Sequence, residues 1–417
     1  MNTTLIETFE GFRFPKMVNY MLVVVLLAAA VLSKEYRKSK STTSKSKSLQ
    51  KPQKSLSLNK DRKFGTWTPE SFQLPVPEPF PNWDIKSTSP LPYRAFKHKY
   101  NITMGIRNMD WNSWFELDNE WTKFHEEKLK RVKQYDKKLH ETGVEAVDAA
   151  YELLDEMRNY LPARYPTLFQ KTNLGVKNLE TGEDHKFRGS YRVYKGPGSE
   201  GEDPMLIAAK MVQDDLAVMM ESDNGEYILK AGAVILPGFW KLEDKYNQTL
   251  ENIHTHGDVP KFKEKLQSPM EKFFIRLTCD KAVVRNNYFL QTDEELGWSS
   301  SIGDEFGEKV GWYTADEAND ISKIHLRSER QSLRRLPKSG AIVFTVRTYF
   351  IPISKLVEEP YIPRRLLNGI QSWEEDVQEY RGYTKFKDIL LPYLEQKAEA
   401  QEKLGYLPEK ETNAFPF

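Results

Sequence analysis

The hydrophobic pattern of the chain begins with one apolar run near the N-terminus. Residues 17–33 read MVNYMLVVVLLAAAVLS, and Asn19 is their only clearly polar interruption. A helix of about 16 residues spans roughly 25 Å, which suits a bilayer somewhat thinner than the usual hydrocarbon core of about 30 Å. The run therefore predicts a transmembrane anchor. A cleaved signal peptide is the competing interpretation, because Ala28–Ala30 resembles the small-residue end of such a peptide.

Charges on either side of this run set the expected orientation. Basic side chains are few before it and many after it, so the positive-inside rule places the C-terminal side in the cytosol. A short anchor suits the endoplasmic reticulum, and we predict a single-pass protein of that membrane, with membrane lipid as a partner. Residues 34–66 are rich in Ser, Lys and Thr, which predicts a disordered basic stalk.

From residue 67 onward the pattern is that of a folded domain. Residues 67–92 are dense in proline and aromatic residues, which predicts an extended arm packed along a domain surface. Between residues 111 and 161 apolar side chains recur at three- and four-residue steps, which predicts helix. Pro162 and Pro166 are expected to end that helical segment.

Strands are predicted in the second half of the domain. Residues 186–236 contain the short apolar runs MLIAAKMV, DLAVMME and EYILKAGAVILP, separated by Gly, Asp and Asn. The run AIVFTVRTYFIPI (341–353) is the clearest strand, because β-branched and aromatic residues fill it. The domain is therefore expected to be α+β, with a mainly antiparallel sheet and flanking helices. Further strands are predicted at 273–278 and 282–291, and helices at 355–368, 372–380 and 384–403.

These elements give an expected domain organisation. It consists of a short tail (1–16), the anchor (17–33), the stalk (34–66), one large domain (67–405) and a second tail (406–417).

Composition narrows the choice of partners. The 417 residues include 61 basic and 60 acidic ones, so the net charge gives no case for nucleic-acid binding. Cys279 is the single cysteine, which excludes an intramolecular disulfide and any multi-cysteine metal site held by one chain. The usual glycine-rich nucleotide motifs, the GxSxG elbow and the HExxH motif are absent from the sequence.

Two constellations could carry chemistry. His254 and His256 form an H-x-H pair in ENIHTHGDVP; imidazole is a good ligand for zinc, iron or haem, but a structural or surface role for the pair stays open. The run LRSERQSLRRLP is crowded with charges, which usually indicates a solvated, salt-bridged turn. Interleaved leucines indicate instead that part of it is buried, and buried arginines need anionic partners such as ligand carboxylates or phosphates. Its charged residues include Arg327, Glu329, Arg330, Arg334 and Arg335.

Several segments resemble one known family in their order along the chain. LRSERQSLRRLPKSGAIVFTVRTYF resembles the C-terminal signature of the haem-dependent oxidative N-demethylase alpha-subunit-like family. Further matching segments are MGIRNMDWNSWFELDNEW (104–121), YLPARYPTLF (160–169), QDDLAVMM (213–220), PGFWKLEDK (237–245), the IH of ENIH, and VVRNNYFLQ (283–291). The resemblance covers roughly residues 80–395, and the wording is similar to the fungal branch called HRQ family proteins.

The resemblance implies a PAS-like fold with haem b held between a sheet and helices. On this chain it implies that His254 is the axial ligand, because it occupies the family's IH position, and that His256 and Cys279 are weaker candidates. The arginines at positions 327, 330, 334 and 335 become candidates to pair with haem propionates, and Glu329 to orient one of them.

The function that follows is a haem-dependent monooxygenase resembling oxidative N-demethylases. It would oxidise a small amine or related metabolite with electrons from a separate reductase, since the sequence shows no flavin or NAD(P) motif. A membrane anchor would then hold the domain beside a membrane-bound reductase. The alternatives are a non-catalytic haem sensor or carrier, and a scaffold that has lost haem.

Overall fold

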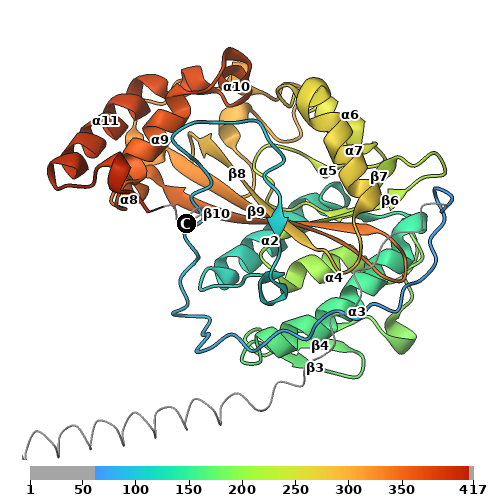
Figure 1. Ribbon diagram of the computed structural model, residues 1–417. Helices are drawn as coiled ribbons and strands as arrows, with labels where there is room; N and C mark the ends of the chain where they lie inside the picture. Colours follow the sequence, from blue (N-terminus) through green and yellow to red (C-terminus); the bar gives the residue numbers. More distant parts are fainter. Residues whose placement is uncertain (1–61, 413–417) are drawn as a thin grey trace, which may run out of the picture. The chain divides into compact units, whose positions relative to one another are not determined.

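The structure is a computed structural model that describes residues 62–412. It has a seven-stranded sheet and a separate three-stranded sheet, with helices on both sides of the larger one (Figure 1). The strands are β1 Arg107–Asn108, β2 His140–Thr142, β3 Phe169–Lys171, β4 Gly175–Asn178, β5 Asp184–Lys186, β6 Asp215–Glu221, β7 Tyr227–Ala233, β8 Val283–Gln291, β9 His325–Arg335 and β10 Ile342–Pro352. The helices are α2 Trp121–Tyr135, α3 Val147–Arg164, α4 Pro204–Met211, α5 Leu242–Lys245, α6 Leu250–Thr255, α7 Gln267–Arg276, α8 Ile353–Leu356, α9 Ile362–Gln371, α10 Glu375–Tyr380 and α11 Lys387–Lys403.

Every strand pair in the large sheet is antiparallel. The strand order is β1-β8-β9-β10-β6-β7-β2, so the two longest strands, β9 and β10, lie near the centre. All eleven residues of β9 are buried, although six of them carry ionisable side chains. A strand of this kind needs specific partners on both of its faces, because side chains alternate along it with a period of two.

Cross-strand pairing divides the sheet into two faces. One face, which we call the α6 face, carries Arg285 opposite Gln331 and Asn287 opposite Glu329. On the other, which we call the α3 face, Arg330 lies opposite both Asn286 and Arg347. Partners in an antiparallel ladder share a face, and neighbours along a strand do not.

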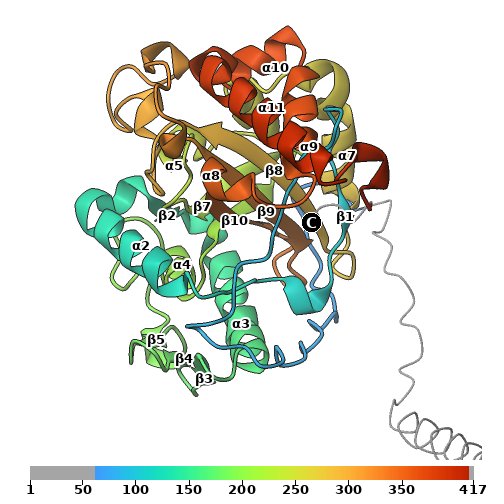
Figure 2. The ribbon, with the colours of Figure 1, turned by 90° about the vertical axis from the view of Figure 1, so that its left-hand side faces the viewer.

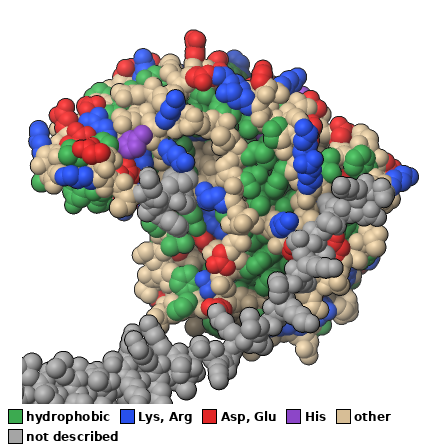
Figure 3. Space-filling model, viewed as in Figure 1, with side chains coloured by type: hydrophobic (Ala, Val, Ile, Leu, Met, Phe, Trp, Pro, Cys, Tyr) green, Lys and Arg blue, Asp and Glu red, His purple; other side chains and the backbone are tan. Residues whose placement is uncertain are grey.

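Each face has its own cover. Apolar residues of α2, α3 and α4 pack with Leu216, Val218 and Val343 of the α3 face. On the opposite side, α5, α6 and α7 pack over Ala217, Leu333 and Phe344. Helices α8 to α11 gather at one end of the sheet, where Figure 2 shows α9 and α11 side by side. Acidic and basic side chains are interspersed over the surface that Figure 3 shows, in line with their nearly equal numbers.

Most of the predicted elements are present. The α+β class and the mainly antiparallel sheet are confirmed, as are the strands β6, β7, β8 and β10 and the C-terminal helices. The region 67–92 contains no helix or strand and lies along the domain, with the Trp67 indole donating to the Pro337 carbonyl at 2.9 Å. The predicted helical segment 111–161 is two helices, α2 and α3, separated by the short strand β2.

Two predicted strands are wrong. The run MLIAAKMV forms α4, because Asp203 caps its N-terminus and Pro204 occupies the first turn. FFIRLT is largely the last turn of α7, which ends at Arg276. Pro162 also lies inside α3 rather than after it, and the helix ends at Arg164.

The predicted membrane localisation needs a correction. No helix within residues 62–412 is long and apolar enough to cross a bilayer, so the structure does not support a single-pass membrane protein. The anchor that we predicted at residues 17–33, and most of the stalk, lie outside the described residues.

Candidate functional site

His254 lies on α6 with one of its ring nitrogens fixed. Nδ1 lies 2.7 Å from the carbonyl oxygen of Leu250, one turn earlier in the helix. A carbonyl can only accept, so Nδ1 carries the proton and Nε2 presents a lone pair. Among residues 62–412 nothing forms a hydrogen bond with Nε2. Burial lowers the pKa of His254, which keeps the imidazole in its neutral, metal-binding form at neutral pH.

The segment after α6 holds this ring in place. Phe262 is buried and stacks on the imidazole, with ring centroids 4.9 Å apart and planes at 9°. It opens a π-helical turn, Phe262–Leu266, which follows Lys261 in the left-handed backbone region. A π-helical turn widens the local helix and occurs often at functional sites. Thr249 caps the N-terminus of α6 by accepting a hydrogen bond from the Asn252 amide. Local interactions therefore hold the chain on both sides of His254.

Polar side chains of the α6 face form the second wall of the site. Arg285 donates through Nε to the Met104 carbonyl at 2.9 Å and through Nη1 to Gln331 Oε1 at 2.7 Å. Gln331 Nε2 in turn donates to Glu329 Oε2 at 2.8 Å. Arg285 and His254 are close enough for the guanidinium charge to contribute to lowering the pKa of the imidazole, after the larger effect of burial.

Several of these side chains keep some accessible surface and yet are strongly desolvated. Burial lowers the pKa of Arg285 and raises the pKa of Tyr380 to about 12, although neither side chain is fully enclosed. Desolvation also raises the pKa of Glu329. These side chains therefore lie just below the surface, where protein surrounds a group without covering it completely.

Aromatic rings continue this wall. Phe239 contacts both Phe289 of β8 and Trp312, with centroids 5.2 and 5.7 Å apart. Phe289 also contacts Tyr380 at 5.9 Å. This side of the sheet therefore combines a polar row, which reaches His254 through Arg285, with aromatic rings that continue from the polar row through Tyr380.

Arg327 also lies on the α6 face, one cross-strand pair beyond Glu329. Its guanidinium donates to the Leu296 carbonyl at 2.9 Å and to the Leu236 carbonyl, and its Nε is buried without a hydrogen-bond partner among the described residues. The loop that covers it passes very close. A Cβ at Gly238, which has φ +80°, would come within 2.6 Å of the guanidinium carbon. Burial lowers the pKa of Arg327, and Glu329 opposes that effect.

The other three predicted arginines lie away from His254. Arg330 and Arg334 are on the α3 face, where Arg330 pairs with Glu116 at 3.3 Å and Arg334 with Glu156 at 2.7 Å. Arg335 is on the α6 face but at its far end, where it donates to the carbonyls of Leu277, Phe274 and Gly340 at 2.6 to 2.7 Å. The six predicted residues therefore do not form one cluster. Arg327 and Glu329 share the α6 face, and Arg285 lies close enough to Glu329 and to His254 to interact electrostatically with both.

The two other candidates also lie apart from this group. His256 is exposed, whereas Cys279 is fully buried, and burial raises the pKa of its thiol. Sequence reasoning missed Arg285, Gln331 and Tyr380. The motif VVRNNYFLQ carried a usable signal, because a strand with that sequence places positions 285, 287 and 289 on one face.

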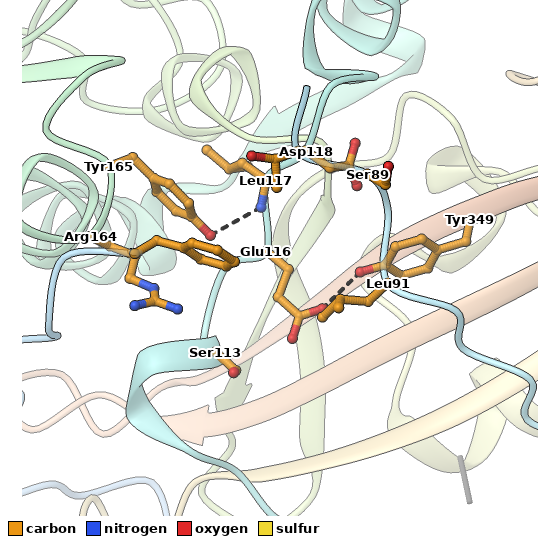
Figure 4. A pocket seen from close by; sticks show the side chains of 11 residues that line it. Ser89, Leu91, Ser113, Glu116, Leu117, Asp118, Arg164, Tyr165 and Tyr349 are labelled. Carbon is orange, nitrogen blue, oxygen red and sulfur yellow. Dashed lines mark hydrogen bonds between the residues drawn. The ribbon is translucent and has the colours of Figure 1, made fainter. Parts of the chain in front are cut away.

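Two cavities are recorded elsewhere in the described part of the chain, and His254 lines neither. One of about 50 Å³ lies at the α3 face, where the hydroxyl of Tyr349 donates to Glu116 and the Leu117 amide to the hydroxyl of Tyr165 (Figure 4). Its size suits one or two water molecules. The other, of about 310 Å³, opens beside α2 and is lined by Arg131, Glu295 and Glu305 among others. Arg131 is paired there with Glu305 at 2.7 Å.

The surroundings of His254 suit haem better than a metal ion held by several protein side chains. Within residues 62–412 no three His, Cys, Asp or Glu side chains are grouped to hold a metal ion. Haem needs only one axial imidazole, with the second ring nitrogen fixed by a carbonyl and apolar side chains around the ring. His254, Leu250 and Phe262 provide this arrangement.

A comparison with known protein families also indicates haem. The model of the family described as haem-dependent oxidative N-demethylase, alpha subunit-like, matches residues 105–391. This span includes α6 and its histidine and all seven strands of the large sheet. The match does not distinguish branches within the family, so the fungal branch stays a prediction. It covers well over half of the chain, which therefore belongs to the haem-dependent oxidative N-demethylase alpha-subunit-like family.

Proposed function

We propose that the chain is a haem-dependent monooxygenase that removes an N-methyl group from a small amine. The observation that carries this proposal is the imidazole of His254, whose Nδ1 is tied to the Leu250 carbonyl while Nε2 has no hydrogen-bond partner among residues 62–412. Family membership supports the haem dependence. A PAS-like arrangement, with haem b between α6 and the sheet, is part of the proposal.

His254 would hold the iron through Nε2. The Leu250 carbonyl fixes the tautomer and, by accepting from Nδ1–H, makes Nε2 a stronger donor. Phe262 holds the ring plane. Haem bound here would supply the oxygen chemistry that releases the methyl carbon as formaldehyde, with two electrons taken from a separate reductase.

Two arginines of the α6 face are the candidates for the haem carboxylates. Arg285 has its Nη2 without a partner among residues 62–412, and Arg327 has an unpaired Nε. Guanidinium groups recognise carboxylates well, because their N–H groups match both oxygens. We propose these two residues in place of the wider set of four. Arg335 already donates to three carbonyls, and Arg330 and Arg334 lie on the opposite face of the sheet, beside Glu116 and Glu156.

Tyr380 and the aromatic border would shape the substrate side. With its pKa raised to about 12, the Tyr380 phenol stays protonated at neutral pH and can donate a hydrogen bond. Phe239 and Phe289 would exclude water near the Tyr380 phenol, and the loss of water strengthens polar interactions there.

The proposal is tested with the full chain loaded with haem. Absorption spectroscopy follows the uptake of haem, and a reductase or dithionite supplies electrons in the presence of oxygen and an N-methyl amine. We expect formaldehyde to form with one oxygen consumed per methyl group. Uptake of haem with no formaldehyde from a panel of methylated amines would favour a sensor or carrier, and no uptake would favour a scaffold.

A further inference from the structure

Glu329 differs from the other carboxylate of the α6 face in how its oxygens are used. Asp215, on β6, accepts from the backbone amides of Ile235 and Leu236 at 2.9 to 3.1 Å. Glu329 uses only Oε2, which accepts from Gln331 at 2.8 Å and from Asn287 at 3.5 Å. Among residues 62–412 nothing donates to Oε1.

This unfilled oxygen lies in a side chain that is only 5% exposed. Leaving a buried acceptor without a donor costs about 1–3 kcal/mol, and more for a charged group, so such an oxygen is normally satisfied. Oε1 is not among the fully enclosed polar atoms that lack partners, so it keeps some accessible surface. A donor that completes Glu329 can therefore come from a bound molecule that reaches this oxygen.

The arginines nearby do not fill this role. The N–H groups of Arg327 donate to the carbonyls of Leu236 and Leu296, and those of Arg285 donate to Met104 and Gln331. Their charges still lower the pKa of Glu329 against the larger effect of burial, which raises it. The carboxylate is thus partly compensated in charge, and its free oxygen still lacks a donor.

A small alkylammonium ion matches what is missing. It brings an N–H donor and a positive charge, both of which an ionised carboxylate oxygen prefers in a desolvated setting. Its alkyl groups would contact the ring of Tyr380, which lies close enough to Glu329 to interact electrostatically and whose face attracts cations. A neutral molecule of the same shape provides neither the charge nor the strong donor.

We propose that Glu329 binds the protonated form of the amine substrate through Oε1 and thereby selects cations over neutral isosteres. The inference rests on the proposed function, since it names the substrate-binding residue of the same site. Glu329 is a positioning residue in this account. It holds the nitrogen, while Arg285 and Arg327 occupy the neighbouring rows of the sheet.

The test measures amine binding rather than turnover. The haem-loaded full chain is titrated calorimetrically with dimethylammonium chloride, the smallest secondary ammonium ion with N-methyl groups, and with dimethyl ether as its neutral isostere. We expect the ammonium ion to bind at least about tenfold more tightly than the ether. Glu329→Gln keeps the shape and removes the charge, so it should weaken ammonium binding about tenfold or more while leaving the haem content unchanged.

Two further variants make the outcome decisive. Glu156→Gln removes a buried carboxylate next to an arginine on the α3 face and should leave ammonium affinity at the wild-type value. Glu329→Asp keeps the charge and should lose less affinity than Glu329→Gln, and it serves if the glutamine variant does not fold. Wild-type affinity in both position-329 variants, or an equal loss in Glu156→Gln, would overturn the inference.

The same titration on the chain without haem separates this inference from the proposed function. If the chain takes up no haem but binds the ammonium ion in a Glu329-dependent manner, the proposed function is wrong and the inference stands. If haem is bound through His254 and the ammonium ion binds equally well to Glu329→Gln, only the inference is wrong.

Discussion

The two faces of the large sheet carry similar residues and use them differently. On the α3 face, Arg330 and Arg334 each have an opposite charge beside them, Glu116 at 3.3 Å and Glu156 at 2.7 Å, although the nitrogens of Arg334 make no hydrogen bond within the described residues. On the α6 face, Arg285 donates to neutral oxygens, and Glu329 has one oxygen without a donor among residues 62–412. A buried ion pair inside the chain serves the fold, whereas a buried charge without a directly paired opposite charge is a better candidate for ligand binding. The comparison assigns structure to one face and binding to the other.

The largest effect is expected on the α3 face. Glu156→Ala leaves Arg334 fully buried, beside the rings of Trp111 and Trp114 and without its carboxylate partner. Breaking a buried pair in this way destabilises a protein by about 3–5 kcal/mol. Urea unfolding followed by circular dichroism measures the loss. Haem uptake per folded molecule should not change, and a change in haem affinity without a loss of stability would reverse the assignment of the faces.

A smaller effect on a different quantity is expected at Arg285. Arg285→Met keeps much of the side-chain volume and removes the guanidinium charge that contributes to lowering the pKa of His254. We expect haem affinity to fall about tenfold, equivalent to about 1.4 kcal/mol, because one carboxylate partner is lost. Competitive haem titration measures the affinity.

Arg330→Met is the matched control on the α3 face. It should lower stability, because Glu116 loses its arginine partner, and leave haem affinity unchanged. If the two methionine variants had the same effect on haem affinity, the two faces would not differ in the way described.

The smallest effect concerns pH. The pKa of His254 is lowered from its ordinary value of 6.5, so the folded protein resists protonation of Nε2. In an unperturbed imidazole about three quarters of the rings would be protonated at pH 6, a roughly fourfold loss of the ligating form. We expect haem binding to survive to pH 6 and to fall only at lower pH. Haem absorbance against pH, with circular dichroism to monitor folding, tests this; release with a midpoint above 6.5 from folded protein would contradict it.

The lowered pKa of His254 also predicts how the stability of the haem-free chain depends on pH. A group with a lowered pKa in the folded state binds fewer protons there than in the unfolded state. The stability of the haem-free chain should therefore fall as pH drops from about 6.5 toward the folded pKa of His254, to the extent that this residue contributes.

The strands could be predicted from sequence where alternation and β-branched residues agreed, as in β10 and β6. Helix α4 could not, because MLIAAKMV is buried on nearly all sides and shows no period. The Asp203–Pro204 pair was the available signal, since this pair suits a helix start. The end of α7 was misassigned for a different reason: FFIRLT is a short run rich in apolar and aromatic residues, and such a run cannot be told from a strand by its length alone.

The site could be predicted only in part. His254 was found through family resemblance, but the charged run was treated as one cluster. Because the run is a single buried strand, its period of two sends Arg327 and Glu329 to one face and Arg330 and Arg334 to the other. The sequence shows little sign of this strand, because charged residues fall on both of its faces and Glu329 and Arg330 are adjacent. Tyr380 comes from α10 near the end of the fold, and no local pattern connects it to His254.

The most direct test of the central claim is the absorption spectrum of the full chain titrated with haem in three forms. His256→Ala is the matched control, because it removes an exposed imidazole two residues from the candidate ligand. We predict that the wild type and His256→Ala give the same Soret band and haem content, and that His254→Ala loses both while keeping its circular dichroism. An unchanged band and haem content in His254→Ala would contradict the account.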